Sequence, residues 1–153
     1  MGSLDNLLTP GRVLCRLDAV SKKRVLELTA QHIASIEKEL EENQLYASLL
    51  ERERLGTTAL GSGVAVPHCR VSGLKEPLGC LVTLSDAIDY DAPDGAGVDL
   101  LFVLLVPPDA NQAHLDLLAE VARRFSDPSY CQRLREAADL ESLLHCAVTS
   151  EAA

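Results

Sequence analysis

The sequence has no tryptophan, and its aromatic residues are limited to two phenylalanines and three tyrosines. Stacking platforms for the bases of nucleic acids are therefore scarce. Positive charge is also in deficit, because 14 lysines and arginines face 23 aspartates and glutamates, which gives a net charge of −9. Neutralising a phosphate backbone needs a basic stripe, and the sequence contains none. We expect no nucleic-acid partner, whereas an acidic surface suits solubility and contact with a basic protein.

Long apolar runs and paired cysteines are missing as well. No stretch approaches the roughly 20 apolar residues of a membrane-spanning helix, and no basic segment followed by an apolar run opens the chain. We therefore expect a cytoplasmic protein without membrane insertion. The five cysteines are scattered singly, without a C-x-x-C pair, so neither a disulfide framework nor a zinc site is indicated. We expect no metal and no cofactor.

The length and the hydrophobic content fit one compact domain. The chain has 153 residues, of which 47% are hydrophobic, and this is enough to build a core without disulfides or metal. No repeat, low-complexity tract or linker divides the sequence. We predict a single domain over residues 1–153, with its core from about 5 to 148.

Helical patterns stand at both ends of the chain. The 3.6-residue apolar period predicts helices over about residues 21–40, 45–55, 109–125, 128–138 and 140–148. Ser21 stands in an N-cap position, and Asp109 with Gln112 has the form of a capping box. Gly56 follows the second helix in the manner of a C-cap.

The middle of the chain is rich in glycine and β-branched residues. Short strands around a turn are expected over residues 56–66, and Pro67, which lacks an N–H, is expected to end sheet pairing there. Residues 78–85 are a strand candidate, and 88–97 form a turn-rich connection. The apolar run 98–106 is typical of a central strand covered on both faces. The fold class predicted is α/β, a small mixed sheet with helices on its faces.

His68 is the sharpest candidate for chemistry. It follows a short apolar strand and Pro67, whose fixed φ holds the imidazole at a strand end, where ligands commonly approach. Cys69 is adjacent, but neighbours on an extended strand point to opposite faces, which argues against a Cys–His pair. The residues alone leave open the alternative that His68 is a hydrogen-bonded surface side chain.

Further polar side chains could assist His68. His114 falls in the first turns of the helix predicted from residue 109, where the helix dipole favours a negative charge, although it also aligns with the apolar face. Arg52 and Arg54 precede the glycine that ends the second helix, and Arg70 follows His68. Arginine suits phosphate oxygens, so these residues could form a basic patch; solvated arginines at a helix end are the alternative.

The segment from Arg52 to His68, RERLGTTALGSGVAVPH, resembles the active-site signature of the type-2 enzyme IIA family of the phosphoenolpyruvate-dependent phosphotransferase system. Ser21-Lys-Lys-Arg-Val-Leu-Glu, Val98-Asp-Leu-Leu-Phe-Val-Leu-Leu-Val-Pro and His114-Leu-Asp-Leu-Leu also stand in that family's order and spacing. The Ser-Lys-Lys-Arg opening, and the lack of an attached IIB or IIC domain, are similar to the nitrogen-regulatory branch rather than the fructose and mannitol transport branch.

The resemblance implies a mixed, about five-stranded sheet and a function as a phosphocarrier. His68 would accept a phosphoryl group from an HPr-like phosphocarrier, itself charged by an enzyme I relative, while Arg52 and His114 assist at that group. The protein would be a carrier and regulator rather than a turnover enzyme, signalling its phosphorylation state to target proteins. Cys69 departs from the family, in which many members have glycine after the active histidine.

Two alternatives stay open beside nitrogen-type regulation. In one, the protein is a sugar-transport enzyme IIA that passes its phosphoryl group to a IIB domain. In the other, it is a pure interaction module whose surface around His68 binds targets in one form only.

Overall fold

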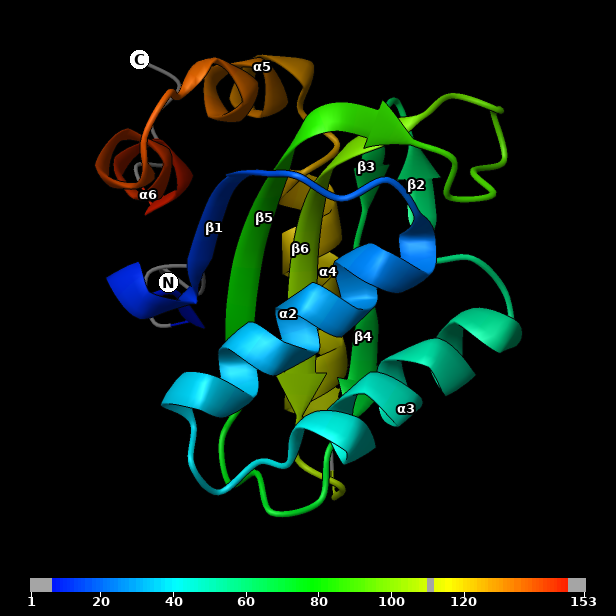
Figure 1. Ribbon diagram of the computed structural model, residues 1–153, viewed down its shortest axis with the longest axis vertical. Helices are drawn as coiled ribbons and strands as arrows, with labels where there is room; N and C mark the ends of the chain where they lie inside the picture. The colour runs from blue at the N-terminus through cyan, green and yellow to red at the C-terminus, as the bar shows by residue number, and fades with distance from the viewer. Residues whose placement is uncertain (1–6, 110–111, 149–153) are drawn as a thin grey trace.

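One mixed β-sheet organises the computed structural model, which describes residues 7–109 and 112–148 (Figure 1). Its strands are β1 (Val13–Leu17), β2 (Ala59–Gly61), β3 (Val64–Ala65), β4 (His68–Arg70), β5 (Leu78–Ile88) and β6 (Val98–Val106). The order is β1-β5-β6-β3-β2, and β4 also pairs with β6. The central pair β5 and β6 is antiparallel, whereas β1 is parallel to β5, and β3 and β4 are parallel to β6. The predicted α/β class and mixed sheet are confirmed.

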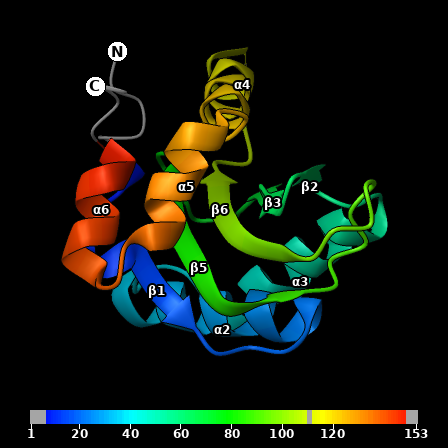
Figure 2. The same ribbon diagram turned by 90° about the horizontal axis from the view of Figure 1, so that it is seen from above.

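Helices cover both faces of the sheet, as Figure 2 shows. They are α2 (Lys22–Ile36), α3 (Glu42–Arg54), α4 (Gln112–Arg124), α5 (Pro128–Glu136) and α6 (Leu140–Val148), with a short 3₁₀ turn η1 (Pro10–Arg12) before β1. The pair α2 and α3 lies on one face, and α4, α5 and α6 lie on the other. Within the described residues, none of the helices is both long and apolar enough to cross a membrane.

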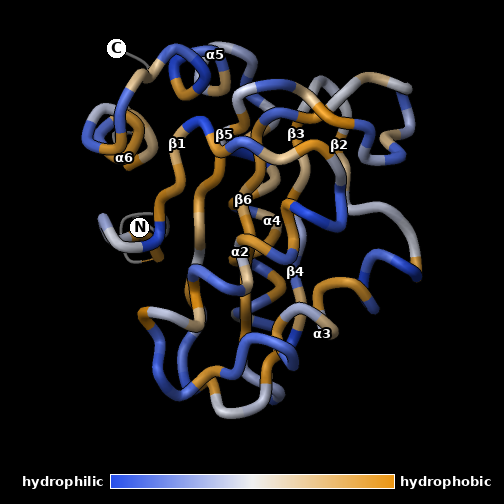
Figure 3. Tube along the Cα trace, in the orientation of Figure 1, coloured by the Kyte–Doolittle hydropathy of each residue, from blue (hydrophilic) through white to orange (hydrophobic). Residues whose placement is uncertain are grey.

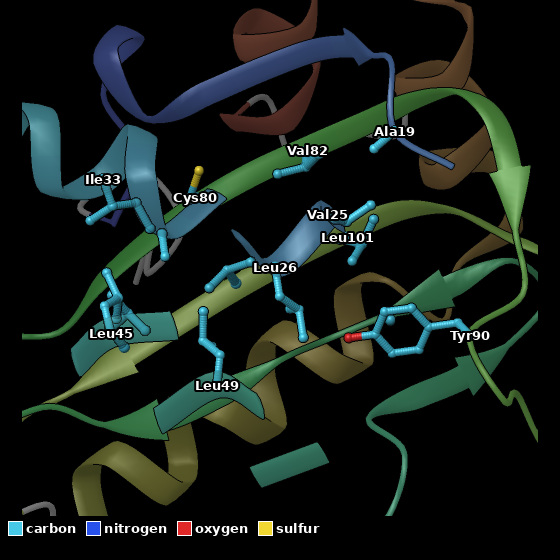
Figure 4. Close-up of a cluster of buried hydrophobic side chains, with 14 of the residues drawn as sticks. Ala19, Val25, Leu26, Ile33, Leu45, Leu49, Cys80, Val82, Tyr90 and Leu101 are labelled. Carbon is cyan, nitrogen blue, oxygen red and sulfur yellow. The ribbon is translucent and has the colours of Figure 1, made fainter. Parts of the chain in front are cut away.

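Two apolar clusters hold these layers together, one on each face of the sheet. Alternate residues of β6 enter them: Leu101, Val103 and Leu105 on the side of α2 and α3, and Leu100, Phe102 and Leu104 on the other side. The central strands are therefore apolar along most of their length, as Figure 3 shows. Figure 4 shows the first cluster, in which Leu26 of α2 and Leu49 of α3 point toward the sheet. The prediction of a central strand buried on both faces is confirmed.

The strands β3 and β4 share one place in the sheet, beside β6. Each paired residue in both stands opposite the β6 residue 36 positions further on, as in Val64 opposite Leu100. Pro67 has no N–H, but its carbonyl oxygen accepts a hydrogen bond from the N–H of Leu104 at 2.8 Å. The prediction that Pro67 ends sheet pairing is therefore wrong. Proline removes a donor but not the acceptor, so pairing resumes at His68.

Other differences from the prediction concern the ends of elements. The first helix ends at Ile36 rather than near residue 40, because Glu37 turns to an extended conformation with φ −104° and ψ 91°. The strand predicted over 78–85 continues to Ile88, and β1 was not predicted. The capping box of Asp109 with Gln112 involves residues 110 and 111, which lie outside the described residues.

Candidate functional site

A cavity of about 680 Å³ opens between the C-terminal end of α3, the strands β4 and β6, and the first turns of α4. Arg52 enters it from α3, His68 from β4 and His114 from α4. Figure 1 shows how far apart these elements stand along the chain, by their colours. The structure thus brings together the three residues that the sequence singled out.

A backbone carbonyl orients the imidazole of His68. Its Nδ1 lies 2.7 Å from the carbonyl oxygen of Val66. A carbonyl oxygen can only accept, so Nδ1 carries the proton of this hydrogen bond. In the neutral ring, the other nitrogen, Nε2, then has a lone pair and no proton. The contact therefore selects the tautomer in which Nε2 is the nucleophilic atom.

The surroundings keep this ring neutral. Burial lowers the pKa of the His68 imidazole below its ordinary value, since a charged ring loses solvation in the half-buried position. The hydrogen bond to Val66 and the negative charge of Glu53 oppose this shift, while the positive charge of Arg52 adds to it. Burial is the largest cause, so the ring is mainly unprotonated at neutral pH.

Arg52 is fixed at the end of its helix by the main chain. Its Nη1 donates a hydrogen bond to the carbonyl oxygen of Gly56 at 2.9 Å. A guanidinium has five donor hydrogens, so this contact orients the group and leaves others for a bound anion. Of the remaining predicted basic residues, Arg70 lines the cavity, whereas Arg54 pairs with Glu51 at 3.1 Å and does not line it.

His114 lies in the first turn of α4 and is half-buried. The next residue, Leu115, and Leu118 one turn further on line the cavity with it. The N-terminal end of a helix favours negative charge, so this wall of the cavity suits an anion. The other two histidines lie elsewhere: neither His32 nor His145 lines the cavity, and Nε2 of His32 contacts the carbonyl oxygen of Gly11 at 2.6 Å.

Cys69 is the neighbour of His68 but faces the other side of the sheet. Its partner in β6 is Leu105, which belongs to the cluster under α2 and α3, whereas His68 is opposite Leu104 of the second cluster. Burial raises the pKa of the Cys69 thiol to about 12. The thiol therefore stays protonated at neutral pH and is a poor nucleophile. The geometry agrees with the expectation that the two side chains form no Cys–His pair.

The sequence analysis missed a buried carboxylate next to the site. Glu53 is only 7% exposed, and its carboxylate contacts Nζ of Lys22 at 3.0 Å and the hydroxyl of Tyr90 at 3.0 Å. It also accepts hydrogen bonds from the N–H and the hydroxyl of Thr58. The one available signal was a glutamate at a position where α3 turns its side chain inward, but its partners Lys22 and Tyr90 stand far away in the sequence.

Metal ligands do not gather at this site. In the part of the chain that the structure describes, residues 7–109 and 112–148, His, Cys, Asp and Glu side chains form no group of three or more that could hold a metal ion. All five cysteines lie within these residues and are free thiols. The polar residues that line the cavity include His68, His114 and the two arginines Arg52 and Arg70, beside Ser48 and Glu51. The guanidinium groups suit an anion such as a phosphoryl group.

Comparison with known proteins assigns the class. Residues 6–146 match the model of the family described as "Phosphoenolpyruvate-dependent sugar phosphotransferase system, EIIA 2". The chain belongs to this family of enzyme IIA components, as the segment from Arg52 to His68 indicated.

Within the family, the chain is similar to proteins named for nitrogen regulation. It is 43% identical over 145 residues to the nitrogen regulatory protein of Pseudomonas aeruginosa, covering 95% of this chain and 94% of that one. The protein of the same name from Escherichia coli is 37% identical over 149 residues, covering 97% and 88%. The crystal structure of nitrogen regulatory protein IIA-Ntr from Neisseria meningitidis matches with a TM-score of 0.87 at 33% identity, covering 94% and 98%. The predicted nitrogen-regulatory branch is confirmed.

Proposed function

We propose that this protein is a phosphocarrier and regulator. Nε2 of His68 accepts a phosphoryl group from the phosphohistidine of an HPr-like carrier, and the phosphorylation state is then signalled through contacts with target proteins. The observation that carries the proposal is the 2.7 Å contact between Nδ1 of His68 and the carbonyl oxygen of Val66, which leaves Nε2 as the nucleophile. Membership in a phosphotransferase-system family supports the choice of donor.

The transfer balances without any further reactant. The Nε2 lone pair forms a bond to phosphorus while the N–P bond of the donor breaks in line, and the electron pair of that bond returns to the donor imidazole. Nδ1 keeps its proton and its hydrogen bond to Val66. The phosphoryl group is bound to an imidazole nitrogen both before and after the transfer, so the two states have similar energy. The site therefore mainly has to align the two rings and exclude water.

Arg52 and His114 are proposed to stabilise the phosphoryl group during this transfer. Charge is spread over its three equatorial oxygens, and donors already held in place stabilise it without reorganisation. Arg52 meets this condition because its hydrogen bond to Gly56 fixes the guanidinium beside the cavity. His114 enters from the opposite wall, at the positive end of α4.

The mouth of the cavity offers a surface for protein partners. Leu55, 79% exposed, and Leu115, 58% exposed, are apolar side chains that line the cavity from its two walls. Exposed apolar side chains around a polar site are typical of a docking face. A phosphoryl group on His68 would add about two negative charges between them and change which partners bind. We place this activity in the cytoplasm, where phosphoenolpyruvate is produced.

Reconstituted phosphotransfer tests the proposal. With phosphoenolpyruvate, enzyme I and an HPr-like carrier, the wild-type protein should gain an acid-labile phosphoryl group. His68→Ala should gain none, because the nucleophile is gone, whereas His145→Ala, which changes an exposed histidine outside the cavity, should be labelled like the wild type. Acid-labile label that persists in His68→Ala contradicts the proposal.

The regulatory half of the proposal has its own test. Target proteins are captured with wild-type protein, with His68→Ala and with a phosphorylated sample, and the three sets are compared. Identical sets exclude a phosphorylation switch. Adding IIB proteins to the phosphorylated sample distinguishes regulation from sugar transport. Label that moves to a IIB domain assigns the protein to sugar transport.

A further inference from the structure

The buried carboxylate of Glu53 lies where four parts of the chain meet. Glu53 belongs to the last turn of α3, Lys22 begins α2, Thr58 precedes β2, and Tyr90 follows β5. The N–H of Thr58 donates to Oε1 of Glu53 at 3.1 Å, and Tyr90 donates to Oε2 at 3.0 Å. Figure 4 shows the Tyr90 ring with its hydroxyl pointing into the interior. A charge that is 7% exposed is retained in a fold only with such partners.

A continuous chain of hydrogen bonds leads from this carboxylate to His68. The N–H and the hydroxyl of Thr58 donate to Glu53. The carbonyl oxygen of Thr58 accepts from the N–H of Val66 at 3.0 Å. The carbonyl oxygen of Val66 accepts from Nδ1 of His68 at 2.7 Å. Each link holds the acceptor that orients the next group.

The main-chain carbonyl of Glu53 helps to hold the glycine that orients Arg52. The N–H of Gly56 donates to the carbonyl oxygen of Glu53 at 3.1 Å, and the carbonyl oxygen of Gly56 accepts from Arg52 at 2.9 Å. The turn over residues 55–58 is therefore held at its start by the end of α3 and at Thr58 by the Glu53 side chain. Movement of this turn would displace Arg52 and His68 together.

We propose that Glu53 is a positioning residue for phosphoryl acceptance: through Thr58 and Val66 it holds His68 in the Nδ1–H tautomer. This inference rests on the proposed function, because it names a residue that prepares the same histidine. Attack by Nε2 leaves the ring with positive charge while Nδ1 keeps its proton. A buried negative charge behind the Val66 carbonyl favours that state, as an acidic partner does for the histidine of a catalytic triad.

The alternative is that Glu53 serves only as the partner of Lys22. Such an ion pair ties α2 to α3 without any effect on His68, and removing one partner would destabilise the fold and nothing else. Two measurements separate the roles. The tautomer and the pKa of His68 respond to the positioning role, whereas the free energy of unfolding responds to both.

Nuclear magnetic resonance of the His68 ring nitrogens tests the proposal directly. In Glu53→Gln, Nε2–H should appear beside Nδ1–H, and the pKa of His68 should fall further, because the negative charge that raises it is gone. The matched control is Asp91→Asn, which removes the exposed carboxylate 3.6 Å from Lys22 and leaves the chain to His68 intact. The other titratable or charged residues that line the cavity stay unchanged in both variants: Glu51, Arg52, Cys69, Arg70 and His114.

The double variant Lys22→Met/Glu53→Gln serves as the control for destabilisation, because it leaves no unpaired lysine in the interior. It should show the same His68 changes as Glu53→Gln. An unchanged tautomer and an unchanged His68 pKa in the double variant overturn the proposal. Phosphoryl acceptance from the HPr-like carrier should be about tenfold slower in both Glu53 variants and normal in Asp91→Asn. If the wild type accepts no phosphoryl group, the proposed function fails, whereas the role of Glu53 is still decided by the ring nitrogens.

Discussion

Two main-chain carbonyl oxygens orient two of the side chains that line the cavity. Val66 holds His68 through Nδ1, and Gly56 holds Arg52 through Nη1. Both side chains are thereby oriented in the absence of a partner, so the proposed binding of a phosphoryl group would need little reorganisation. The orientation of these side chains therefore matters as much as their chemical type.

The lowered pKa of His68 should set the pH range of the proposed phosphoryl acceptance. Nε2 is a nucleophile only while the ring is neutral, so the rate must fall when pH drops through the pKa of the folded protein. Burial lowers this pKa, so the fall should occur at a more acidic pH than for free histidine. The rate of transfer from the HPr-like carrier, measured between about pH 5 and 8, checks this. A fall centred above the pKa of free histidine contradicts it.

Substitution of the helper residues should slow transfer without abolishing it. Arg52→Ala removes a fixed donor to the phosphoryl oxygens, for which a loss of about 100-fold in rate is typical. His114→Ala should also slow transfer, and by less, since the acceptor atom and Arg52 remain. Rapid-quench measurement of transfer checks both, with Arg54→Ala as the control because Arg54 lies outside the cavity. Equal rates in Arg52→Ala and Arg54→Ala would exclude a role for Arg52.

The local pattern marked His68, Arg52 and His114 as candidates, but it left open a surface histidine, solvated arginines and a core-edge histidine, and the resemblance to the enzyme IIA family decided the prediction. It could not predict Glu53, whose function depends on partners up to 37 positions away. A glutamate at the end of a helix is ordinarily exposed, and nothing local indicates that α2 and the loop after β5 will bury it.

Among the elements, the strands closest to the core were the easiest to predict. The nearly unbroken apolar run of β6 reflects burial on both faces, and the observed bounds Val98–Val106 agree with the expectation. The strand β1 escaped prediction because only Val13 of its residues is fully buried, so the chain there shows little alternation. The interruption at Pro67 was misjudged because pairing beyond a proline depends on the neighbouring strand β6.

Gly79 of β5 faces the buried ring of Phe102 in β6, which leaves no room for a larger side chain. A Cβ at Gly79 would lie 2.5 Å from Cζ of Phe102, whose ring is fully buried and packs against Phe125 with 5.5 Å between centroids. Gly79→Ala should therefore lower the free energy of unfolding by about 1–3 kcal/mol. Urea unfolding checks this. Gly11→Ala, where the added Cβ would find ordinary contacts, should change it by at most about 0.5 kcal/mol.

For the whole molecule, the shared sheet should make unfolding cooperative. Leu49 belongs to one apolar cluster and Leu134 to the other, and both are almost fully buried. Leu49→Ala and Leu134→Ala should each cost about 2–5 kcal/mol and shift the transition of both faces together. Tyr90 and Tyr130 report on the two faces, because each lies in one cluster. Separate midpoints for the two tyrosines in urea would contradict a single unfolding unit.

The hydrogen bond from His68 to Val66 also limits how sequences with this site can diverge. The acceptor is a main-chain carbonyl, which every amino acid carries, so position 66 can change among small apolar residues that fit its buried space. The number of residues between Val66 and His68 has no such freedom. One residue inserted or deleted there would turn the imidazole away from its acceptor, because successive side chains of an extended strand point to opposite faces. Natural variation around this histidine should therefore consist of substitutions at constant length.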